Sequence, residues 1–304
     1  MIYRDYLGLD VSPAELRVAS LRRKRKGAVL TGGRAIPLAS GVITPSVREP
    51  NIRDPQRFTE AVQELLRPLA GREERISLSL PETAGRILLT EMETTPTSRN
   101  EGVEALKWQL KSSLPGEAKE VHLDYQVLEK SESGRLRLVV TVIARSVLQQ
   151  YEELLAAAGF NAAIIDFHCH HLYNYYRSRL EMGDDFVLVG IENKVLSLQY
   201  FQGRVLTFHR SREVESTPVR IFQELNRSLV SCQENFPVFR RAAVFVHCDS
   251  EERLGLLDAL RSAFEQEVIS LDPHLAKLGV SESQQLPRGA WELVAAVGAA
   301  ERMM

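Results

Sequence analysis

The sequence has few cysteines, no long apolar run and almost no net charge. Its three cysteines are unevenly spaced, so we expect reduced thiols rather than a disulfide framework: Cys169, Cys232 and Cys248. No apolar stretch approaches the roughly 20 residues that span a bilayer, and we expect no signal peptide. A formal charge of −2 gives no overall attraction to nucleic acid or anionic lipid. These absences predict a cytoplasmic protein that reaches a membrane only through a partner.

A strand–turn–strand pattern occurs twice, in residues 6–21 and in residues 186–206. The copies read YLGLDVSPAELRVASL and FVLVGIENKVLSLQYFQGRVL, each with an apolar strand, a polar turn and an alternating strand. A third strand follows each copy, at residues 28–38 and 204–209. This duplication predicts two related lobes that face each other across a cleft. The plan resembles the actin and sugar-kinase fold, in which two such hairpins hold the phosphates of ATP.

The pattern between the copies predicts a subdomain inserted in the first lobe. An amphipathic helix at residues 55–70 and a strand at 75–80 precede a change in composition. The insert, at about residues 83–144, is predicted to hold one helix and three strands, at 98–110, 86–92, 121–128 and 135–143. It is a small α+β unit near the lower size limit for independent folding.

Strands and helices alternate after the insert, which predicts mixed sheets flanked by helices in an α/β protein. Helices are expected at 146–158, 217–235, 251–264 and 291–302, and strands at 162–166, 242–247 and 267–271. The one obvious hinge, at 181–185, divides the chain into a first lobe of residues 1–182 and a second of 183–304. The short link between the third strand of the second copy and the helix at 217 predicts a trimmed outer subdomain there.

Several short motifs, in their order along the chain, are similar to those of one family. They are Leu114-Pro115, Leu123-Asp124-Tyr125, Ala158-Gly159-Phe160, Asp166 and Ala296-Val297-Gly298, with LGLD near the start. With these motifs the chain resembles the PilM family of actin-like type IV pilus assembly proteins. The resemblance implies a bilobed actin-like fold (that of actin, Hsp70 and sugar kinases) and a cytoplasmic protein peripheral to the inner membrane. It also implies docking by the N-terminal peptide of a PilN-type membrane protein, contacts with other pilus platform proteins, and commonly ATP.

The first hairpin departs from the phosphate-binding pattern that this fold implies. Its Asp10-Val11-Ser12 matches a motif whose Asp orders magnesium and whose Gly admits the phosphates, so Ser12 replaces that Gly. Pro13 follows and has no N–H to offer. Arg17 takes the place of the family's usual Lys, which keeps a cation.

The second hairpin departs further. Gly190-Ile191-Glu192 lacks the Asp and puts a carboxylate where the second Gly is expected, with Lys194 close enough to neutralise it. The double glycine expected under the adenosine falls at Cys248-Asp249. We therefore expect ATP binding to be lost or weak. No cofactor is then predicted, and Asp10 would hold magnesium only if Mg-ATP binds.

Two other clusters invite a functional interpretation. The run His168-Cys169-His170-His171 has zinc-ligand chemistry, but no second Cys or His pair completes a site, so ordinary helix-start and core positions are favoured. Residues 22–26 are five consecutive basic residues at a predicted hairpin tip. A solvated tip is favoured over contact with anionic lipid, and nucleic acid is not expected because no aromatic pattern accompanies the charge.

The insert helix carries two further predictions. Glu104 and Lys107 have the spacing of a surface ion pair. Trp108 is interpreted as a core residue, with a partner groove as the alternative.

Three functions remain open. The first is a scaffold of the pilus inner-membrane platform that binds a PilN-type peptide in a groove beside the insert. The second is a GspL-like protein of a type II secretion platform, although such chains continue into a transmembrane helix whereas this sequence ends at Met304. The third is an active ATPase of the actin superfamily with Asp10 on magnesium.

Overall fold

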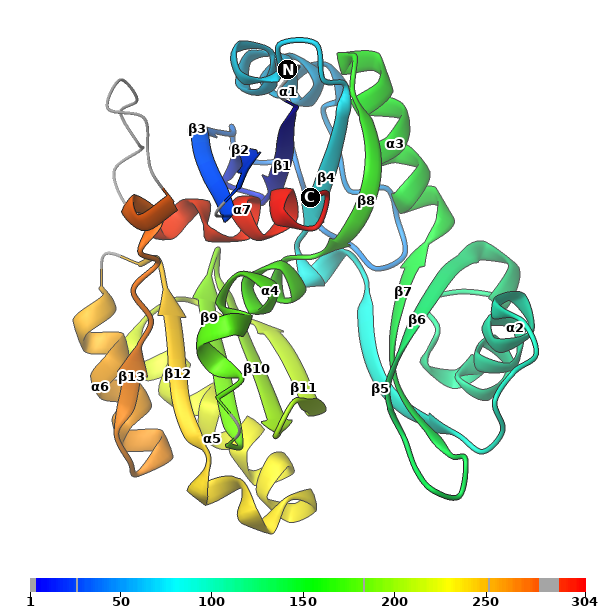
Figure 1. Ribbon diagram of the computed structural model, residues 1–304, viewed down its shortest axis with the longest axis vertical. Helices are drawn as coiled ribbons and strands as arrows, with labels where there is room; N and C mark the ends of the chain where they lie inside the picture. Colours follow the sequence, from blue (N-terminus) through cyan, green and yellow to red (C-terminus); the bar gives the residue numbers. More distant parts are fainter. Residues whose placement is uncertain (1–3, 26, 183, 251, 279–289) are drawn as a thin grey trace.

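Two five-stranded sheets of matching topology form the body of the protein (Figure 1). The computed structural model describes residues 4–25, 27–182, 184–250, 252–278 and 290–304. The first sheet has the order β3-β2-β1-β4-β8. Its strands are β1 (Asp5–Val11), β2 (Glu15–Lys24), β3 (Gly27–Pro37), β4 (Arg75–Leu80) and β8 (Asn161–Phe167). The first three pair antiparallel, whereas β1, β4 and β8 run parallel.

The second sheet repeats this arrangement in the order β11-β10-β9-β12-β13. Its strands are β9 (Phe186–Glu192), β10 (Val195–Gln202), β11 (Val205–Glu213), β12 (Ala243–Cys248) and β13 (Val268–Ser270). Again three antiparallel strands are followed by parallel ones. In both sheets the first hairpin therefore lies beside parallel strands, and the hairpin turn lies at the carboxyl end of the first strand.

Helices cover the outer face of each sheet. On the first sheet lie α1 (Pro55–Ala70) and α3 (Arg145–Ala158), whose buried side chains include Phe58, Leu65 and Tyr151. On the second lie α5 (Pro218–Asn235) and α6 (Arg253–Phe264). The predicted bounds of α1 agree with the structure because the Asp54 side chain caps its start and Gly71, at φ 57°, ends it.

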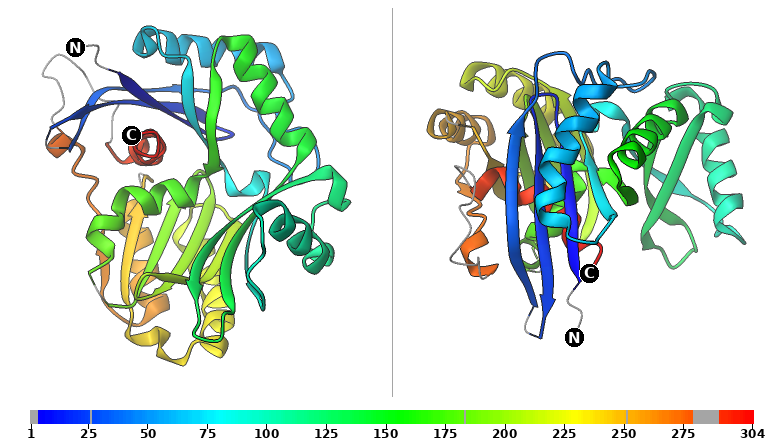
Figure 2. Two further views of the ribbon diagram at one scale, coloured as in Figure 1. Left: turned by 45° about the vertical axis from the view of Figure 1, so that its right-hand side comes forward. Right: turned by 90° about the horizontal axis from the view of Figure 1, so that it is seen from above.

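Two helices lie between the sheets, and each packs on the sheet of the other half of the chain (Figures 1 and 2). Helix α4 (His168–Leu180) packs on the second sheet, and α7 (Val294–Glu301) contacts β1 and β2 of the first. Residues 294–300 of α7 are all buried, as expected for a helix that is apolar on every side. The predicted division at residue 182 thus follows chain order, whereas in space these two helices are exchanged.

The exchanged helices approach other backbones very closely. A Cβ on Gly298 of α7 would lie 2.2 Å from the carbonyl oxygen of His171 in α4. A Cβ on Gly8 of β1 would lie 2.0 Å from the carbonyl oxygen of Ala296. Both positions therefore require glycine, and they hold α4, α7 and β1 in contact at one place.

The insert is a three-stranded sheet with one helix, and it lies to one side of the two lobes (Figure 1). The antiparallel strands are β5 (Arg86–Met92), β7 (Leu136–Ala144) and β6 (Val121–Lys130), in that order across the sheet. Helix α2 (Arg99–Gln109) buries Leu106 against them. The short 3₁₀ segments of the chain are Glu82–Ala84, Lys111–Ser113, Ala118–Glu120, Pro237–Arg241, Leu275–Leu278 and Ala290–Leu293.

The two predictions for α2 have opposite outcomes. The ion pair is confirmed, with Lys107 Nζ 2.9 Å from Glu104 Oε1. The core position of Trp108 is wrong, because its side chain is 83% exposed. Leu106 occupies the core instead, and a residue two places further along a helix points about 200° away from it.

In the second lobe, only residues 214–217 connect the third strand of the sheet to the next helix. Strand β11 extends to Glu213, four residues beyond the predicted end, and α5 begins at Pro218. The C-terminal helix predicted at 291–302 is a 3₁₀ turn followed by α7. Among the described residues, no helix combines the length and the apolar character needed to cross a membrane.

Candidate functional site

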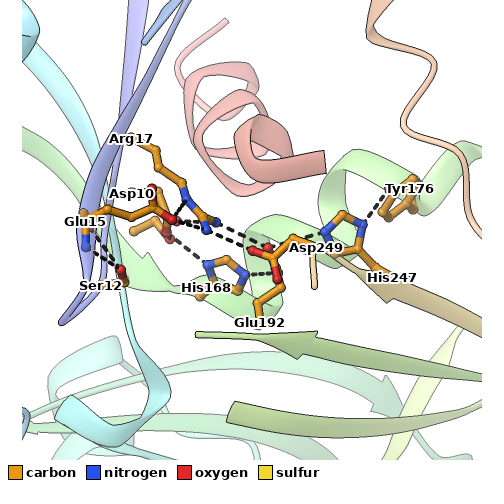
Figure 3. Close-up of polar contacts among 10 residues, drawn as sticks. Asp10, Ser12, Glu15, Arg17, His168, Tyr176, Glu192, His247 and Asp249 are labelled. Atoms are coloured by element: carbon orange, nitrogen blue, oxygen red, sulfur yellow. Dashed lines mark hydrogen bonds and ion pairs between the residues drawn. The ribbon is translucent and has the colours of Figure 1, made fainter. Parts of the chain in front are cut away.

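The two duplicated hairpin turns face each other and bring the predicted site residues together (Figure 3). Asp10 lies at the end of β1 and Arg17 on β2, while Glu192 ends β9 and Asp249 follows β12. Strands β1 and β9 point toward each other from the two sheets (Figure 1), so residues about 180 positions apart meet in the cleft. The duplication in the sequence therefore correctly predicts that these residues lie close together.

Arg17 is the centre of this site. Its side chain is 2% exposed, and its guanidinium lies among four carboxylates. Two come from the first lobe, with Nε 2.9 Å from Glu15 and Nη1 3.9 Å from Asp10. Two come from the second, with Nη2 2.8 Å from Asp249 and Nη1 3.4 Å from Glu192. Burial alone lowers the pKa of the guanidinium, but these carboxylates outweigh burial and raise it.

His168, the first residue of α4, forms a second bridge across the cleft. Its Nδ1 lies 2.9 Å from Asp10 Oδ1, and its Nε2 contacts Glu192 Oε2. Burial lowers the pKa of the imidazole, yet Glu192 and Asp10 together raise it well above its usual value. Each ring nitrogen thus faces a carboxylate from a different lobe, an arrangement that favours the imidazolium form.

Glu192 is neutralised from three sides. Besides Arg17 and His168, the Nε2 atom of His247 lies 3.3 Å from it. Burial raises the pKa of Glu192, but His168 and His247 hold it well below the usual range. Lys194, the predicted neutralising residue, is exposed in the β9–β10 turn instead. Asn193 and Lys194 form the two-residue hairpin turn, with φ of 50° and 61°. Positive φ at both residues is typical of such turns.

The first turn is closed on itself. The Ser12 side chain donates to Glu15 O at 3.0 Å and accepts from Glu15 N at 3.1 Å. The Ser12 N–H also donates to Glu15 O. Asp10 Oδ1, which the resemblance assigns to magnesium, already accepts from Ser79 and contacts His168. The Ser12 donors and Asp10 Oδ1 are thus engaged within the protein, whereas Asp10 Oδ2 is buried without a hydrogen-bond partner among the described residues.

Close packing around Gly190 leaves no room for a side chain at this position. A Cβ there would lie 2.6 Å from Ser197 Oγ and 3.1 Å from Leu172. The space left between the two turns is about 20 Å³, lined by residues that include Ser12, His168, Gly190 and Glu192. That space suffices for about one water molecule.

Side chains also fill the region beside Cys248-Asp249, where the resemblance places the adenosine. Cys248 is buried, and the guanidinium of Arg253 lies 3.8 Å from the ring centroid of Trp291. The same ring lies 5.6 Å from that of His247, whose Nδ1 is 2.9 Å from Tyr176 Oη. The nucleoside region is therefore occupied by an aromatic and cationic stack.

The residues missed by sequence reasoning are His168, His247, Glu15 and Trp291. Only His168 had a signal, as part of the run at residues 168–171. The run does not converge on one point: His168 faces the cleft, whereas His170 Nδ1 lies 2.7 Å from Asp166. Burial lowers the pKa of His171 to about 4. The described residues contain no group of three or more His, Cys, Asp or Glu side chains placed so that they could hold a metal ion.

A second candidate region is the groove between the insert and the first lobe. One cavity of about 760 Å³ lies among β6, β7, β8 and α3, and an adjoining one of about 400 Å³ extends toward α4 and β11. They share Asp166, His170 and Arg302. We call the two together the insert groove. Strands β6 and β8 are each the last strand of their sheet, so both line it with an open backbone edge.

A polar cluster lies where the two cavities meet. Asp166 accepts from His170 Nδ1 and pairs with Arg302. Burial alone raises the pKa of Asp166, but His170, His171 and Arg302 hold it far below its usual range. His170 Nε2 is buried and has no hydrogen-bond partner among the described residues. Since Nδ1 donates to Asp166, Nε2 of the neutral ring is free to accept a hydrogen bond from a ligand N–H.

Removal of the Arg17 charge should strongly destabilise the fold. Arg17→Met leaves four carboxylates without their common cation, and we expect the free energy of unfolding to fall by about 3–5 kcal/mol. Urea titration followed by circular dichroism measures it. The control is Arg53→Met, which removes an exposed pair with Glu49 and should cost less than about 1 kcal/mol. Equal losses in the two variants would contradict a central role for Arg17.

The His168 bridge should make stability depend on pH. Its raised folded pKa means that the contribution is complete below the unfolded value of about 6.5 and declines as the pH rises through the folded value. The stability difference between wild type and His168→Gln should therefore be largest near pH 6 and shrink toward pH 9. Urea unfolding across this range measures it, with the exposed His122→Gln as control. A difference independent of pH would show that His168 is uncharged in the cleft.

Comparison with known proteins bears on the whole chain. A family model described as type IV pilus assembly protein PilM matches residues 8–216. A solved PilM-PilN type IV pilus biogenesis complex contains a chain of 17% identity with a TM-score of 0.81, and the match covers 98% of each chain. No curated protein matches the sequence.

More distant solved structures share the fold. The cytoplasmic domain of EpsL, an inner-membrane component of the type II secretion system of Vibrio cholerae, is 12% identical with a TM-score of 0.54, over 98% of this chain and 95% of that one. A Bacteroides thetaiotaomicron protein with an actin-like ATPase fold is 11% identical with a TM-score of 0.55, over 91% and 96%. The predicted actin-like α/β fold is confirmed. Because the family model matches well over half of the sequence, the chain belongs to the family of the type IV pilus assembly protein PilM.

Proposed function

We propose that this protein is a cytoplasmic scaffold of the pilus inner-membrane platform that works without ATP. It binds the N-terminal peptide of a PilN-type membrane protein in the insert groove and is thereby held at the inner membrane, beside other platform proteins. The observation that carries the proposal is the contrast between the two candidate sites. Among the described residues, the space between the two hairpin turns has room for about one water molecule, whereas the insert groove has about 760 Å³ in its larger cavity alone.

The charges in the cleft support the loss of ATP binding. Arg17 and His168 face the carboxylates of Asp10, Glu15, Glu192 and Asp249, so anionic groups outnumber cations. Burial, and to a smaller extent the neighbouring Glu192, raises the pKa of Asp249, although Arg17 lowers it. A triphosphate entering this cleft would add further negative charge and would have to displace Arg17 from its partners. An active ATPase is therefore disfavoured.

The shape and chemistry of the insert groove support a peptide ligand. An extended peptide can pair its backbone with an open strand edge, and β8 and β6 both present one. The β8 side of the groove is apolar, with Ala162, Ile164 and Ile165, and it ends at the Asp166–His170 pair. The β6 side is polar, with Asp124 and Gln126. An apolar wall that faces placed polar groups is typical of a site that binds a short peptide and sets its register.

The secretion-platform alternative has weaker support. Over nearly the whole chain, the TM-score with the EpsL domain is 0.54, against 0.81 for the chain of the PilM-PilN complex. The family match to residues 8–216 also favours the pilus system.

Mg-ATP should leave the thermal stability unchanged. A site with a Kd of about 10 μM would add about 2.7 kcal/mol at 1 mM ligand, because ligand binding to the folded state stabilises it by mass action. We expect no shift of the unfolding midpoint at 1 mM Mg-ATP in differential scanning fluorimetry. Calorimetric titration provides an independent readout. Binding tighter than about 10 μM would contradict the proposal and favour the ATPase alternative.

Substitution of His170 should weaken peptide binding. His170→Ala removes the buried Nε2 acceptor from the groove, and we expect at least a tenfold loss of affinity, which corresponds to about 1.4 kcal/mol. Fluorescence anisotropy with the N-terminal peptide of the PilN-type partner measures it.

The matched control is His274→Ala. His274 also pairs with an aspartate, Asp272 at 3.4 Å, but it lies outside the groove. Unchanged affinity in both variants would place the peptide elsewhere.

A further inference from the structure

We propose that the tip of the β2–β3 hairpin binds anionic lipid headgroups, so that the protein contacts the membrane directly as well as through its partner. The proposal rests on the proposed function, which brings the protein to a membrane. It concerns residues 22–25, and the basic run continues in the sequence to residue 26. The favoured ligand is the surface of a bilayer that contains acidic phospholipid.

The tip extends beyond the rest of its sheet. Asp5, the first residue of β1, is opposite Arg22, and beyond this point β2 pairs with β3 alone among the described residues, as far as Lys24 opposite Gly27. Figure 2 shows the two strands projecting from the body of the molecule in its right-hand view. Side chains at such a tip can reach a flat surface without obstruction from neighbouring elements.

The charges at the end of the tip, on Arg23, Lys24 and Arg25, form no ion pair with the described acidic side chains. Arg22 is tied to Asp5 by two hydrogen bonds of 2.8 Å, which stiffens the base of the hairpin. Arg23, Lys24 and Arg25 are exposed. The chain as a whole has a formal charge of −2, so the positive charge is confined to the tip. The tip can therefore attract an anionic surface that contacts it alone.

The C-terminus, which is close in sequence to the groove residue Arg302, lies on the side of the protein toward which the tip projects. In the right-hand view of Figure 2, the β2–β3 hairpin and the C-terminus both lie toward the same side of the protein. Arg302, two residues before that terminus, lines the groove. A peptide that leaves the groove for the membrane and a hairpin that contacts the membrane are therefore compatible in one orientation.

Lipid is favoured over nucleic acid. Single-stranded nucleic acid is bound through aromatic stacking platforms, and residues 22–25 contain no aromatic side chain. Basic residues close to an acidic bilayer each increase partitioning about fivefold, so three to four of them give weak binding. Weak binding is sufficient beside a peptide anchor, because the anchor makes the second contact intramolecular.

The test uses the full chain, without peptide, and vesicles of phosphatidylcholine with or without 30% phosphatidylglycerol. We expect co-sedimentation only with the acidic vesicles, and loss of binding in high salt as the charges are screened. The double variant Arg23→Gln/Lys24→Gln should bind about 25-fold more weakly, from two residues at about fivefold each.

The matched control is Arg240→Gln/Arg241→Gln, which removes two exposed arginines from the 3₁₀ segment Pro237–Arg241 of the second lobe. It should bind vesicles like wild type. Equal binding by all three proteins, or no binding to acidic vesicles, would overturn the proposal. So would an oligonucleotide bound more tightly than the acidic vesicles with the same dependence on Arg23 and Lys24.

Peptide affinity is measured with the same proteins. We expect it to be unchanged by either double variant, since neither pair of residues lines the insert groove. Failure of vesicle binding with normal peptide binding overturns the lipid proposal alone. Failure of wild type to bind the peptide overturns the proposed function instead.

Discussion

The arrangement of the two lobes depends on one buried cation. Arg17 is nearly inaccessible to solvent, and a buried charge is tolerated only when it is paired and hydrogen-bonded. Here the pairing must come from both lobes, because Glu15 and Asp10 occupy one side and Asp249 and Glu192 the other. In a working nucleotide site, cationic groups surround an anionic ligand. Here anionic side chains from both lobes surround a cationic side chain of the protein itself, and these contacts join the lobes. His168 has the same role at the second contact.

This internal pairing separates structure from recognition in the molecule. The cleft, which in an ATPase would hold the ligand, is filled by the protein's own side chains and acts as part of the core. The two surfaces that we propose for partners lie outside it, at the insert groove and at the β2–β3 tip. Under the proposed function, the protein has no nucleotide-dependent state that changes its affinity for a partner. Its interactions would then be set by the presence of the partner and by the composition of the membrane.

Local patterns predicted most elements, and long-range contacts account for the errors. The bounds of α1, β4 and β5 follow from periodicity, capping and proline, which act within a few residues. The meeting of Asp10, Arg17, Glu192 and Asp249 was predictable because the duplicated hairpins fix their places. His168, His247 and Trp291 were not, since nothing near them in the chain shows which charges they face. Trp108 was assigned to the core because composition favours burial, but its phase on α2 points it outward. Chain order likewise gave no sign that α4 and α7 exchange sheets.

The glycine contacts between the exchanged helices have a mechanical consequence. At Gly298 the backbones of α7 and α4 touch, and at Gly8 the backbone of β1 touches α7 on its other side. Backbones at this distance cannot slide past each other without a clash, whereas a small turn about the contact point changes the distances little. Any opening of the molecule is therefore a scissor-like rotation about this crossing. The charged contacts of Arg17 and His168 across the cleft then oppose this rotation and stabilise the closed arrangement of the lobes.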